Sequence, residues 1–266
     1  EGYLRREEPD FVIHAAGLVG GIQHNMRQPT RFLLENSLIG MNLISTSQEM
    51  GIKNFMNLGS SCMYPRNARN PLHENMILKG ELEPTNEGYA LAKIMGAKLC
   101  EYISLENADF LYKTVIPCNL YGRHDKFDES LSHMIPAVLK KIHSAYHLNS
   151  SVVEIWGDGM ARREFMYAGD FADFIFYAIE NFSTMPSLLN VGLGMDYSIK
   201  EYYDAISNVI GFSGDFYFNK EKPTGMKQKL VDINRLESFG WSHQFSLAEG
   251  LSHTYQYYNE LNNDQL

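Results

Sequence analysis

Tyr89 and Lys93 are four residues apart, and side chains of these types at this spacing could together transfer a proton. On a helix, side chains four apart lie on the same face, one turn from each other. A free phenol has a pKa of about 10, but a neighbouring ammonium lowers this pKa, so that the phenol can exchange a proton with a carbonyl or alcohol oxygen near neutral pH. Because Tyr and Lys also occur at this spacing on solvated helices, the pair needs support from the elements around it.

Apolar runs and stretches of helical periodicity alternate along the chain. The expected strands cover residues 11–16, 54–58, 111–117, 152–156, 188–191 and 216–218, and the expected helices cover about 30–50, 89–106, 131–147, 169–181, 199–210 and 247–260. Short apolar strands that alternate with helices predict an α/β fold, a Rossmann-like doubly wound parallel sheet with a smaller α+β substrate domain. In this prediction a dinucleotide-binding domain comprises residues 1–121 and about 163–195, and a substrate-binding domain comprises about 122–162 and 196–266.

The composition excludes several classes of protein. The 266 residues, 44% hydrophobic and 21% charged, suit one large domain or two modest ones that share a cleft. A net charge of −9 argues against a nucleic-acid partner but leaves an anionic small substrate open, because a few local cations suffice. The three cysteines show no metal-ligand spacing and predict a reducing compartment, the cytoplasm. No apolar run approaches the roughly 18 residues of a membrane span, and the printed sequence shows no signal-peptide pattern.

Three short motifs stand at the ends of successive elements. They are Gly59-Ser60-Ser61, the pair Tyr89 and Lys93, and Pro117-Cys118-Asn119-Leu120-Tyr121-Gly122. Together they resemble the extended short-chain dehydrogenase/reductase superfamily. Further motifs resemble GDP-L-fucose synthases over essentially the whole chain: His14-Ala15-Ala16, Val19-Gly20-Gly21-Ile22, Cys62-Met63-Tyr64-Pro65, Glu83 to Tyr89, His124-Asp125, Trp156-Gly157, Arg163-Glu164-Phe165 and Gly240-Trp241.

The resemblance implies an NADPH-dependent enzyme that epimerises and then reduces a GDP-linked 4-keto-6-deoxy sugar, giving GDP-L-fucose. Tyr89 would protonate the keto oxygen, with Ser60 hydrogen-bonded to the same oxygen, and Lys93 would lower the pKa of Tyr89 and bind the nicotinamide ribose. Inversion of a carbon beside a ketone needs a base on one face and an acid on the other. The residues that match this pair are Cys62 and His133, whose alternatives are a small buried hydrophobe and a surface histidine.

The resemblance also implies two sets of binding residues. The cofactor set is Leu58, Gly59, Ser60, Ser61, Lys93, Pro117, Cys118, Asn119, Leu120 and His133. The substrate set is Asn119, Lys141, Trp156, Arg163 and Lys229, with no metal. Lys141 stands where the family often has arginine, and Trp156 could instead be a core aromatic. His24 and His124, near the glycine loops, are weak further candidates.

One feature of the family has no counterpart in the sequence. Family members begin with a strand, a Gly-x-x-Gly-x-x-Gly turn and a helix that hold the cofactor pyrophosphate, so we expect the N-terminal strand–helix units to be missing.

Two alternatives to a GDP-L-fucose synthase stay open: a reductase for a related GDP-linked deoxyhexose or deoxyheptose, and a non-catalytic sugar-nucleotide-binding subunit. By analogy with the superfamily, the helices 30–50 and 89–106 predict a homodimer.

Overall fold

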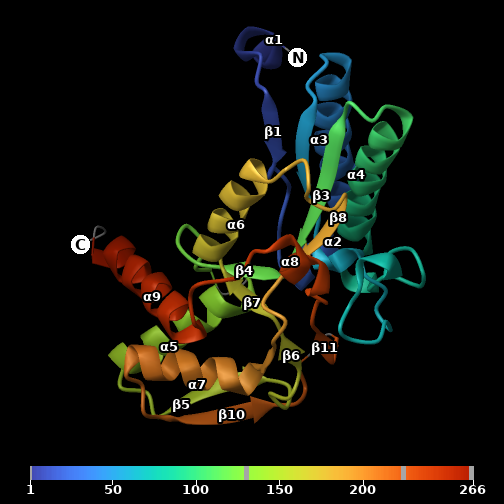
Figure 1. Ribbon diagram of the computed structural model, residues 1–266. Coiled ribbons are helices and arrows are strands. Elements are labelled where there is room, and N and C mark those ends of the chain that lie inside the picture. The colour runs from blue at the N-terminus through green and yellow to red at the C-terminus, as the bar shows by residue number, and fades with distance from the viewer. Residues whose placement is uncertain (1, 129–131, 223–225, 264–266) are drawn as a thin grey trace.

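Four parallel strands form the central sheet of this computed structural model, which describes residues 2–128, 132–222 and 226–263. In spatial order they are β1 (Phe11–His14), β2 (Asn54–Leu58), β3 (Leu111–Pro117) and β8 (Leu188–Val191). The helices α3 (Pro29–Glu49) and α4 (Glu87–Glu106) lie together on one side of the sheet, and α6 (Ala168–Glu180) lies on the other (Figure 1). Helices on both faces of a parallel sheet confirm the predicted Rossmann-like α/β fold.

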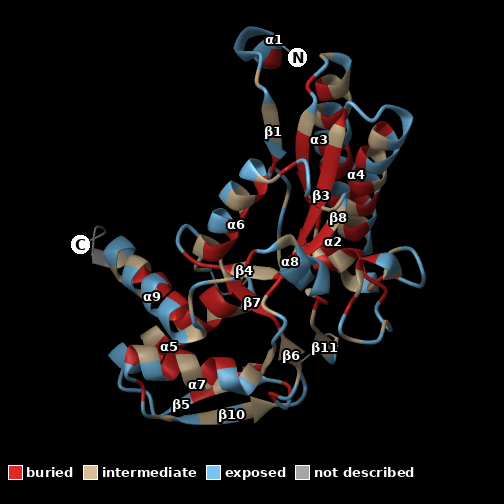
Figure 2. Cartoon of the chain, in the orientation of Figure 1, coloured by how far each residue is buried: buried red, intermediate tan, exposed pale blue. Residues whose placement is uncertain are grey.

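The strands are apolar on both faces because both faces are covered. On β2, Phe55 belongs to a buried cluster with Ile44 of α3 and Ile103 of α4, whereas its neighbour Met56 belongs to the cluster that includes Phe174 of α6. Successive strand residues point to opposite faces, so an uninterrupted apolar run is required here. Figure 2 shows buried residues along β2 and β3 and on the helix faces that turn toward them.

Helices α3 and α4 approach each other closely where α4 begins. A Cβ atom added to Gly88 would lie 2.8 Å from the carbonyl oxygen of Pro29, the first residue of α3. Glycine at this position therefore lets the first turn of α4 reach the cavity described below.

A second unit packs beneath the sheet (Figure 1). It contains α5 (Met134–His147), α7 (Ile199–Ile210) and α9 (Leu247–Asn263), together with the parallel pair β5 (Val152–Trp156) and β10 (Asp215–Asn219). Three short strands lie between the units in the order β11 (Gln228–Lys229), β6 (Arg162–Arg163) and β9 (Tyr197–Ser198). The pair β4 (Asn119–Tyr121) and β7 (Phe165–Tyr167) continues from the ends of β3 and β6. The predicted domain boundaries stay a prediction, although Val231, Leu236 and Trp241 join the core cluster of the sheet rather than that of the second unit.

Most predicted elements are confirmed, and the differences fall at their ends and in short segments. The strand expected over 11–16 ends at His14, and the helix expected over 131–147 begins at Met134, while Leu131 lies outside the described residues. Several short elements were not predicted: α1 (Gly2–Glu7), α2 (Ile22–Arg27), α8 (Asn234–Phe239), the 3₁₀ turns η1 (Ser61–Met63), η2 (Glu74–Met76) and η3 (Pro84–Asn86), and the strands β4, β6, β7, β9 and β11. In the part of the chain that the structure describes, no helix has the length and hydrophobicity to cross a membrane.

Candidate active site

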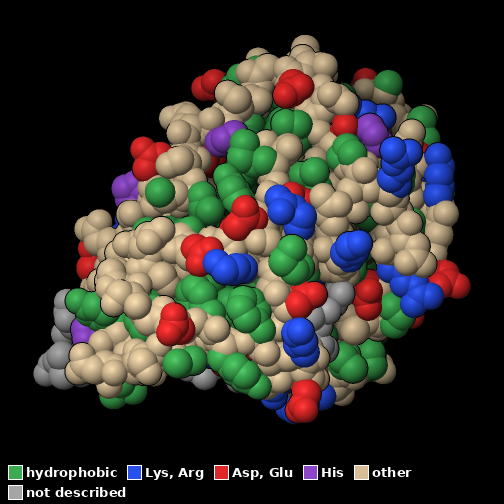
Figure 3. Space-filling model, turned by 90° about the horizontal axis from the view of Figure 1, so that it is seen from below, with side chains coloured by type: hydrophobic (Ala, Val, Ile, Leu, Met, Phe, Trp, Pro, Cys, Tyr) green, Lys and Arg blue, Asp and Glu red, His purple; other side chains and the backbone are tan. Residues whose placement is uncertain are grey.

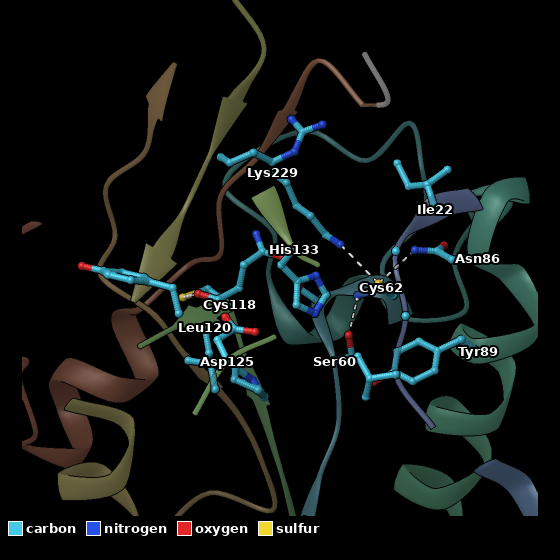
Figure 4. Close-up of a pocket in the computed structure, with 18 of the residues that line it drawn as sticks. Ile22, Ser60, Cys62, Asn86, Tyr89, Cys118, Leu120, Asp125, His133 and Lys229 are labelled. Carbon is cyan, nitrogen blue, oxygen red and sulfur yellow. Dashed lines mark hydrogen bonds between the residues drawn. The ribbon is translucent and has the colours of Figure 1, made fainter. Parts of the chain in front are cut away.

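A cavity of about 500 Å³ opens at the carboxyl ends of β2 and β3, the edge at which sheets of this kind bind ligands. It brings together twelve of the predicted site residues: Gly59, Ser60, Ser61, Cys62, Tyr89, Pro117, Cys118, Asn119, Leu120, His133, Arg163 and Lys229. Figure 4 shows Ser60, Cys62 and Tyr89 on one side of this space and His133 across from them.

The turn after β2 places Ser60 and Cys62 at the cavity. Gly59 donates its N–H to the carbonyl of Val115 at 2.8 Å, and a Cβ atom at Gly59 would lie 3.2 Å from that oxygen. The hydroxyl of Ser60 then accepts the N–H of Cys62 at 3.2 Å and caps the 3₁₀ turn η1. The close strand contact and the cap therefore fix both side chains.

Tyr89 and Lys93 stand on the first turns of α4, as predicted. Lys93 Nζ donates to the carbonyl of Leu58 at 2.9 Å and lies 5.7 Å from the ring centroid of Tyr89. Burial raises the pKa of Tyr89, the charge of Cys62 raises it further, and a hydrogen bond with Ser60 opposes the rise. Burial therefore dominates the pKa of Tyr89, and the expected lowering by Lys93 stays a prediction. Tyr89 is protonated at neutral pH.

The sulfur of Cys62 faces two nitrogen donors. Asn86 Nδ2 lies 3.1 Å from Cys62 Sγ, and Lys229 Nζ lies 3.6 Å from it (Figure 4). The other two cysteines are buried, and burial raises the pKa of Cys100 to about 12 and that of Cys118 well above its usual value. Of the three cysteines, Cys62 alone both lines the cavity and has a lysine ammonium, that of Lys229, beside its sulfur.

His133 precedes the first residue of α5 and lines the same cavity. Asp125 lines it too; burial raises the pKa of this carboxyl group, and its hydrogen bond to the N–H of Lys126 and the charge of His133 oppose the rise. Of the weak candidates, His124 lines the cavity and its Nδ1 lies 2.9 Å from the hydroxyl of Tyr257. His24 instead packs edge-on against the ring of Phe32.

Arg163 and Lys229 stand side by side at the cavity because they are paired residues of the parallel strands β6 and β11. The carboxylate of Glu164 holds this arrangement by accepting three backbone N–H groups, from Leu193 at 2.6 Å, Gly194 at 3.0 Å and Val231 at 2.9 Å. Burial nevertheless raises the pKa of Glu164 to about 7. Sequence reasoning missed Glu164 and Asn86 as site residues, although both lie within motifs that carry the resemblance.

Lys141 and Trp156 do not line the cavity. They gather around Glu154 of β5: Lys141 Nζ donates to its backbone carbonyl at 2.6 Å, and Trp156 Nε1 donates to its carboxylate at 3.0 Å. Trp156 is 43% exposed, so the core-aromatic alternative is wrong. Leu58 and Lys93 also lie outside the lining, immediately behind Ser60 and Tyr89.

The residues at the cavity fit the nicotinamide end of a dinucleotide. Pro117, Cys118 and Leu120 supply an apolar wall for a flat ring, and Lys93, immediately behind the lining, supplies a half-buried ammonium that could bind ribose hydroxyls. Among residues 2–128, 132–222 and 226–263, no group of three or more His, Cys, Asp or Glu side chains could hold a metal ion.

His14, at the end of β1, makes the stability of the protein depend on pH. It is 4% exposed, its Nδ1 has no partner, and burial together with the charge of Lys93 lowers its pKa to about 4. Between about pH 6.5 and pH 4 the unfolded chain takes up a proton at this site and the folded chain does not. The free energy of unfolding should therefore fall by up to about 3 kcal/mol as the pH falls through this range.

We expect His14→Leu to flatten this part of the stability profile, as measured by urea unfolding at several pH values. The control is His253→Leu, which removes an exposed histidine. An equally steep fall in the His14→Leu variant would contradict the assignment.

Comparison with known proteins agrees with this geometry. The model of the NAD dependent epimerase/dehydratase family matches residues 1–192. A GDP-L-colitose synthase of Yersinia pseudotuberculosis is 58% identical over 263 residues, which cover 98% of this chain and 85% of that protein. A GDP-L-fucose synthase of Azorhizobium caulinodans is 50% identical over 258 residues, which cover 97% and 82% of the two chains.

Two solved structures have the same architecture. A GDP-6-OMe-4-keto-L-xylo-heptose reductase from C. jejuni superposes with a TM-score of 0.90 at 32% identity and covers 98% of this chain and 85% of that one. MlghC, a GDP-mannoheptose C4 reductase from Campylobacter jejuni with NADP bound, superposes with a TM-score of 0.86 at 33% identity, covering 97% and 85%. This chain thus belongs to the NAD dependent epimerase/dehydratase family and, within it, to the enzymes of the GDP-L-fucose synthase type.

Proposed function

We propose that the protein epimerises a GDP-linked 4-keto-6-deoxy sugar and then reduces its keto group with NADPH, giving GDP-L-fucose. The observation that carries the proposal is that two proton-transfer sets open onto one cavity. Tyr89 with Ser60 forms the set for reduction, and Cys62 with His133 forms the set for epimerisation. The family is enzymatic, so we do not retain the alternative of a non-catalytic binding subunit.

For reduction, NADPH would supply the hydride that is added to the keto carbon. Tyr89 would give its phenolic proton to the keto oxygen, while Ser60 donates a hydrogen bond to the same oxygen. The raised pKa of Tyr89 supports this role, because the donor must be protonated before hydride arrives. Lys93 would orient the nicotinamide ribose from behind the tyrosine.

For epimerisation, a base removes the proton from a carbon beside the ketone, and an acid returns one to the opposite face. Cys62 and His133 come from different elements, the turn after β2 and the start of α5, and both line the cavity. This arrangement is consistent with a sugar ring that binds between Cys62 and His133, with one residue on each face. The enolate formed in the first step is stabilised by the same donors that serve reduction, Tyr89 and Ser60.

The nucleotide would bind between the cavity and the second unit. Arg163 lines the cavity and can bind the diphosphate, whereas Trp156 and Lys141 form a separate group that can receive the base or the distal phosphate. On the face of the second unit in Figure 3, Lys and Arg side chains are mixed with Asp and Glu. A few local cations, rather than a basic face, would therefore bind the GDP.

The test is to supply GDP-4-keto-6-deoxymannose and NADPH in deuterated water. We expect NADPH oxidation, GDP-L-fucose as the product, and deuterium at the two carbons that flank the ketone. Reduction without deuterium at these carbons would leave only the reductase alternative, and no oxidation of NADPH would contradict the proposal.

A second candidate product is GDP-L-colitose, favoured by the 58% identity to the Yersinia protein. Colitose carries no hydroxyl at C3, so a 3-deoxy substrate would need inversion at C5 only. Rates with the 3-hydroxy and 3-deoxy keto sugars, with products identified by NMR, would decide between the two.

We also propose that two copies associate through α3 and α4. Residues spaced three, four or seven apart form an exposed apolar stripe on each helix: Leu34, Leu38 and Met41 on α3, and Leu91, Met95, Tyr102 and Leu105 on α4. The two helices pack against each other, so the stripes together form one surface that a second copy could cover as a four-helix bundle.

Leu38→Glu should convert this dimer to a monomer, because it would bury an unpaired carboxylate at the centre of the apolar surface. Light scattering coupled to size exclusion measures the change. Leu148→Glu, at a 79% exposed position after α5, is the matched control and should stay dimeric. A Leu38→Glu variant with the mass of the parent protein would rule out this surface as the interface.

A further inference from the structure

We propose that Lys229 is the charge partner of Cys62 and positions its sulfur to remove a proton from the sugar. This inference rests on the proposed epimerase function. It assigns Lys229 to the thiol instead of to the GDP moiety.

Lys229 Nζ and Cys62 Sγ meet at 3.6 Å although the residues are 167 positions apart in the sequence. Within the described residues, this sulfur is the one hydrogen-bond partner of the Lys229 ammonium, and no carboxylate pairs with it. Of the two arginines that line the cavity, Arg163 donates to the backbone carbonyl of Arg162 at 2.7 Å, and Arg123 lies over the ring of Tyr257. The ammonium of Lys229 is thus directed to the thiol.

An ammonium group can only donate hydrogen bonds, so the sulfur must be the acceptor in this contact. An accepting sulfur also explains why the amide nitrogen of Asn86 approaches it, at 3.1 Å. Two donors, one of them charged, therefore hold the sulfur at the cavity. Cys62 is therefore suited to accept a proton from carbon.

The backbone around Lys229 is anchored on both sides. Strand β11 pairs with β6 in a register that sets Lys229 opposite Arg163. The next two residues are bound through their N–H groups, Leu230 to Asn70 Oδ1 at 2.8 Å and Val231 to the Glu164 carboxylate at 2.9 Å. These bonds fix the base of the lysine side chain, so the position of its ammonium follows from the fold.

The chemical step balances with these groups alone. The thiolate of Cys62 takes the proton from the carbon beside the ketone, so an S–H bond forms and a C–H bond breaks. The electron pair moves to the keto oxygen as an enolate. His133 then gives a proton to the opposite face of the carbon, and the pair returns to carbon. Lys229 offsets the charge on sulfur before the step and gives up no proton.

Alkylation of Cys62 by iodoacetamide in the substrate-free protein tests the proposal, because only the thiolate reacts. Mass spectrometry of the Cys62 peptide gives the rate at each pH from 5.5 to 9. Lys229→Met should slow the reaction roughly tenfold at pH 7, because the sulfur loses the charged group that faces it. Lys229→Arg, which retains the positive charge, should keep most of the rate.

The matched control is Lys227→Met, which removes the same charge from an exposed side chain two residues away. It should react at the rate of the parent protein. Cys100 reports on folding, because it is buried away from the cavity lining and becomes reactive only if a variant unfolds.

Equal alkylation rates in Lys229→Met and Lys227→Met would overturn the proposal. A variant with normal alkylation and a raised KM would mark Lys229 as a substrate ligand, which also overturns it. The expected result is that Lys229→Met is alkylated more slowly than the parent protein and exchanges deuterium into the sugar more slowly, while its KM changes little. If Lys229→Met slows alkylation but the parent protein epimerises no GDP-linked keto sugar, the inference about the thiol stands and the proposed function fails.

Discussion

Replacing Tyr89 by phenylalanine should lower the rate of NADPH oxidation roughly a thousandfold. The variant lacks the phenolic proton that the keto oxygen must receive as hydride reaches the keto carbon. Burial raises the pKa of Tyr89, so the loss should be similar from pH 6 to pH 8, where the parent phenol is protonated throughout. Stopped-flow absorbance at 340 nm measures the rate.

The loss in Tyr89→Phe should be confined to reduction. Deuterium should still enter the carbons beside the ketone, because Cys62 and His133 are unchanged, although the exchange is slowed by the loss of one enolate donor. Tyr217→Phe is the control, since it removes a hydroxyl from a 59% exposed position on β10, away from the cavity lining. If Tyr89→Phe reduces the sugar at the parent rate, another group is the proton donor.

Replacing Cys62 by serine should separate the two activities. Deuterium exchange and formation of GDP-L-fucose from GDP-4-keto-6-deoxymannose should fall roughly a thousandfold, because a serine hydroxyl is far too weak an acid to be present as the anion. Serine can still accept hydrogen bonds from Asn86 and Lys229, so the cavity should keep its shape. Reduction of a substrate that has already been epimerised should stay within about threefold of the parent rate.

The control for this experiment is Cys100→Ser, which replaces sulfur by oxygen in α4 away from the cavity lining. It should support both steps. An equal loss of epimerisation and reduction in Cys62→Ser would mean that the thiol shapes the cavity instead of transferring a proton. Product analysis by NMR, run beside NADPH oxidation, distinguishes the two results.

The fold was largely predictable because each signal is local. The apolar runs at 54–58 and 111–117 lie where β2 and β3 form, and the periodicity of 199–210 lies where α7 forms. A buried parallel strand must be apolar on both faces, and an amphipathic helix must repeat every three to four residues. The two-residue strands β6, β9 and β11 carry no such pattern, because their pairing partners lie far away in the sequence.

The position of the site was predictable for the same reason. Parallel strands end at one edge of the sheet, so residues that follow β2 and β3 meet there, as Ser60 and Asn119 do. The substrate residues were harder to predict. Arg163 reaches the cavity, whereas Trp156, seven residues before it, lies in a separate group around Glu154.

The sequence by itself determined that Tyr89 and Lys93 share a helix face and that Ser60 and Cys62 end a strand, since these relations need only local geometry. Only the tertiary structure decided the electrostatics of these groups. Burial, not Lys93, dominates the pKa of Tyr89, because the ammonium is bound to a carbonyl behind it. Likewise the approach of Lys229 to Cys62 depends on a strand pairing and a buried carboxylate remote in sequence from both. Desolvation and the distance between charges are properties of the packed molecule, and no spacing along the chain specifies them.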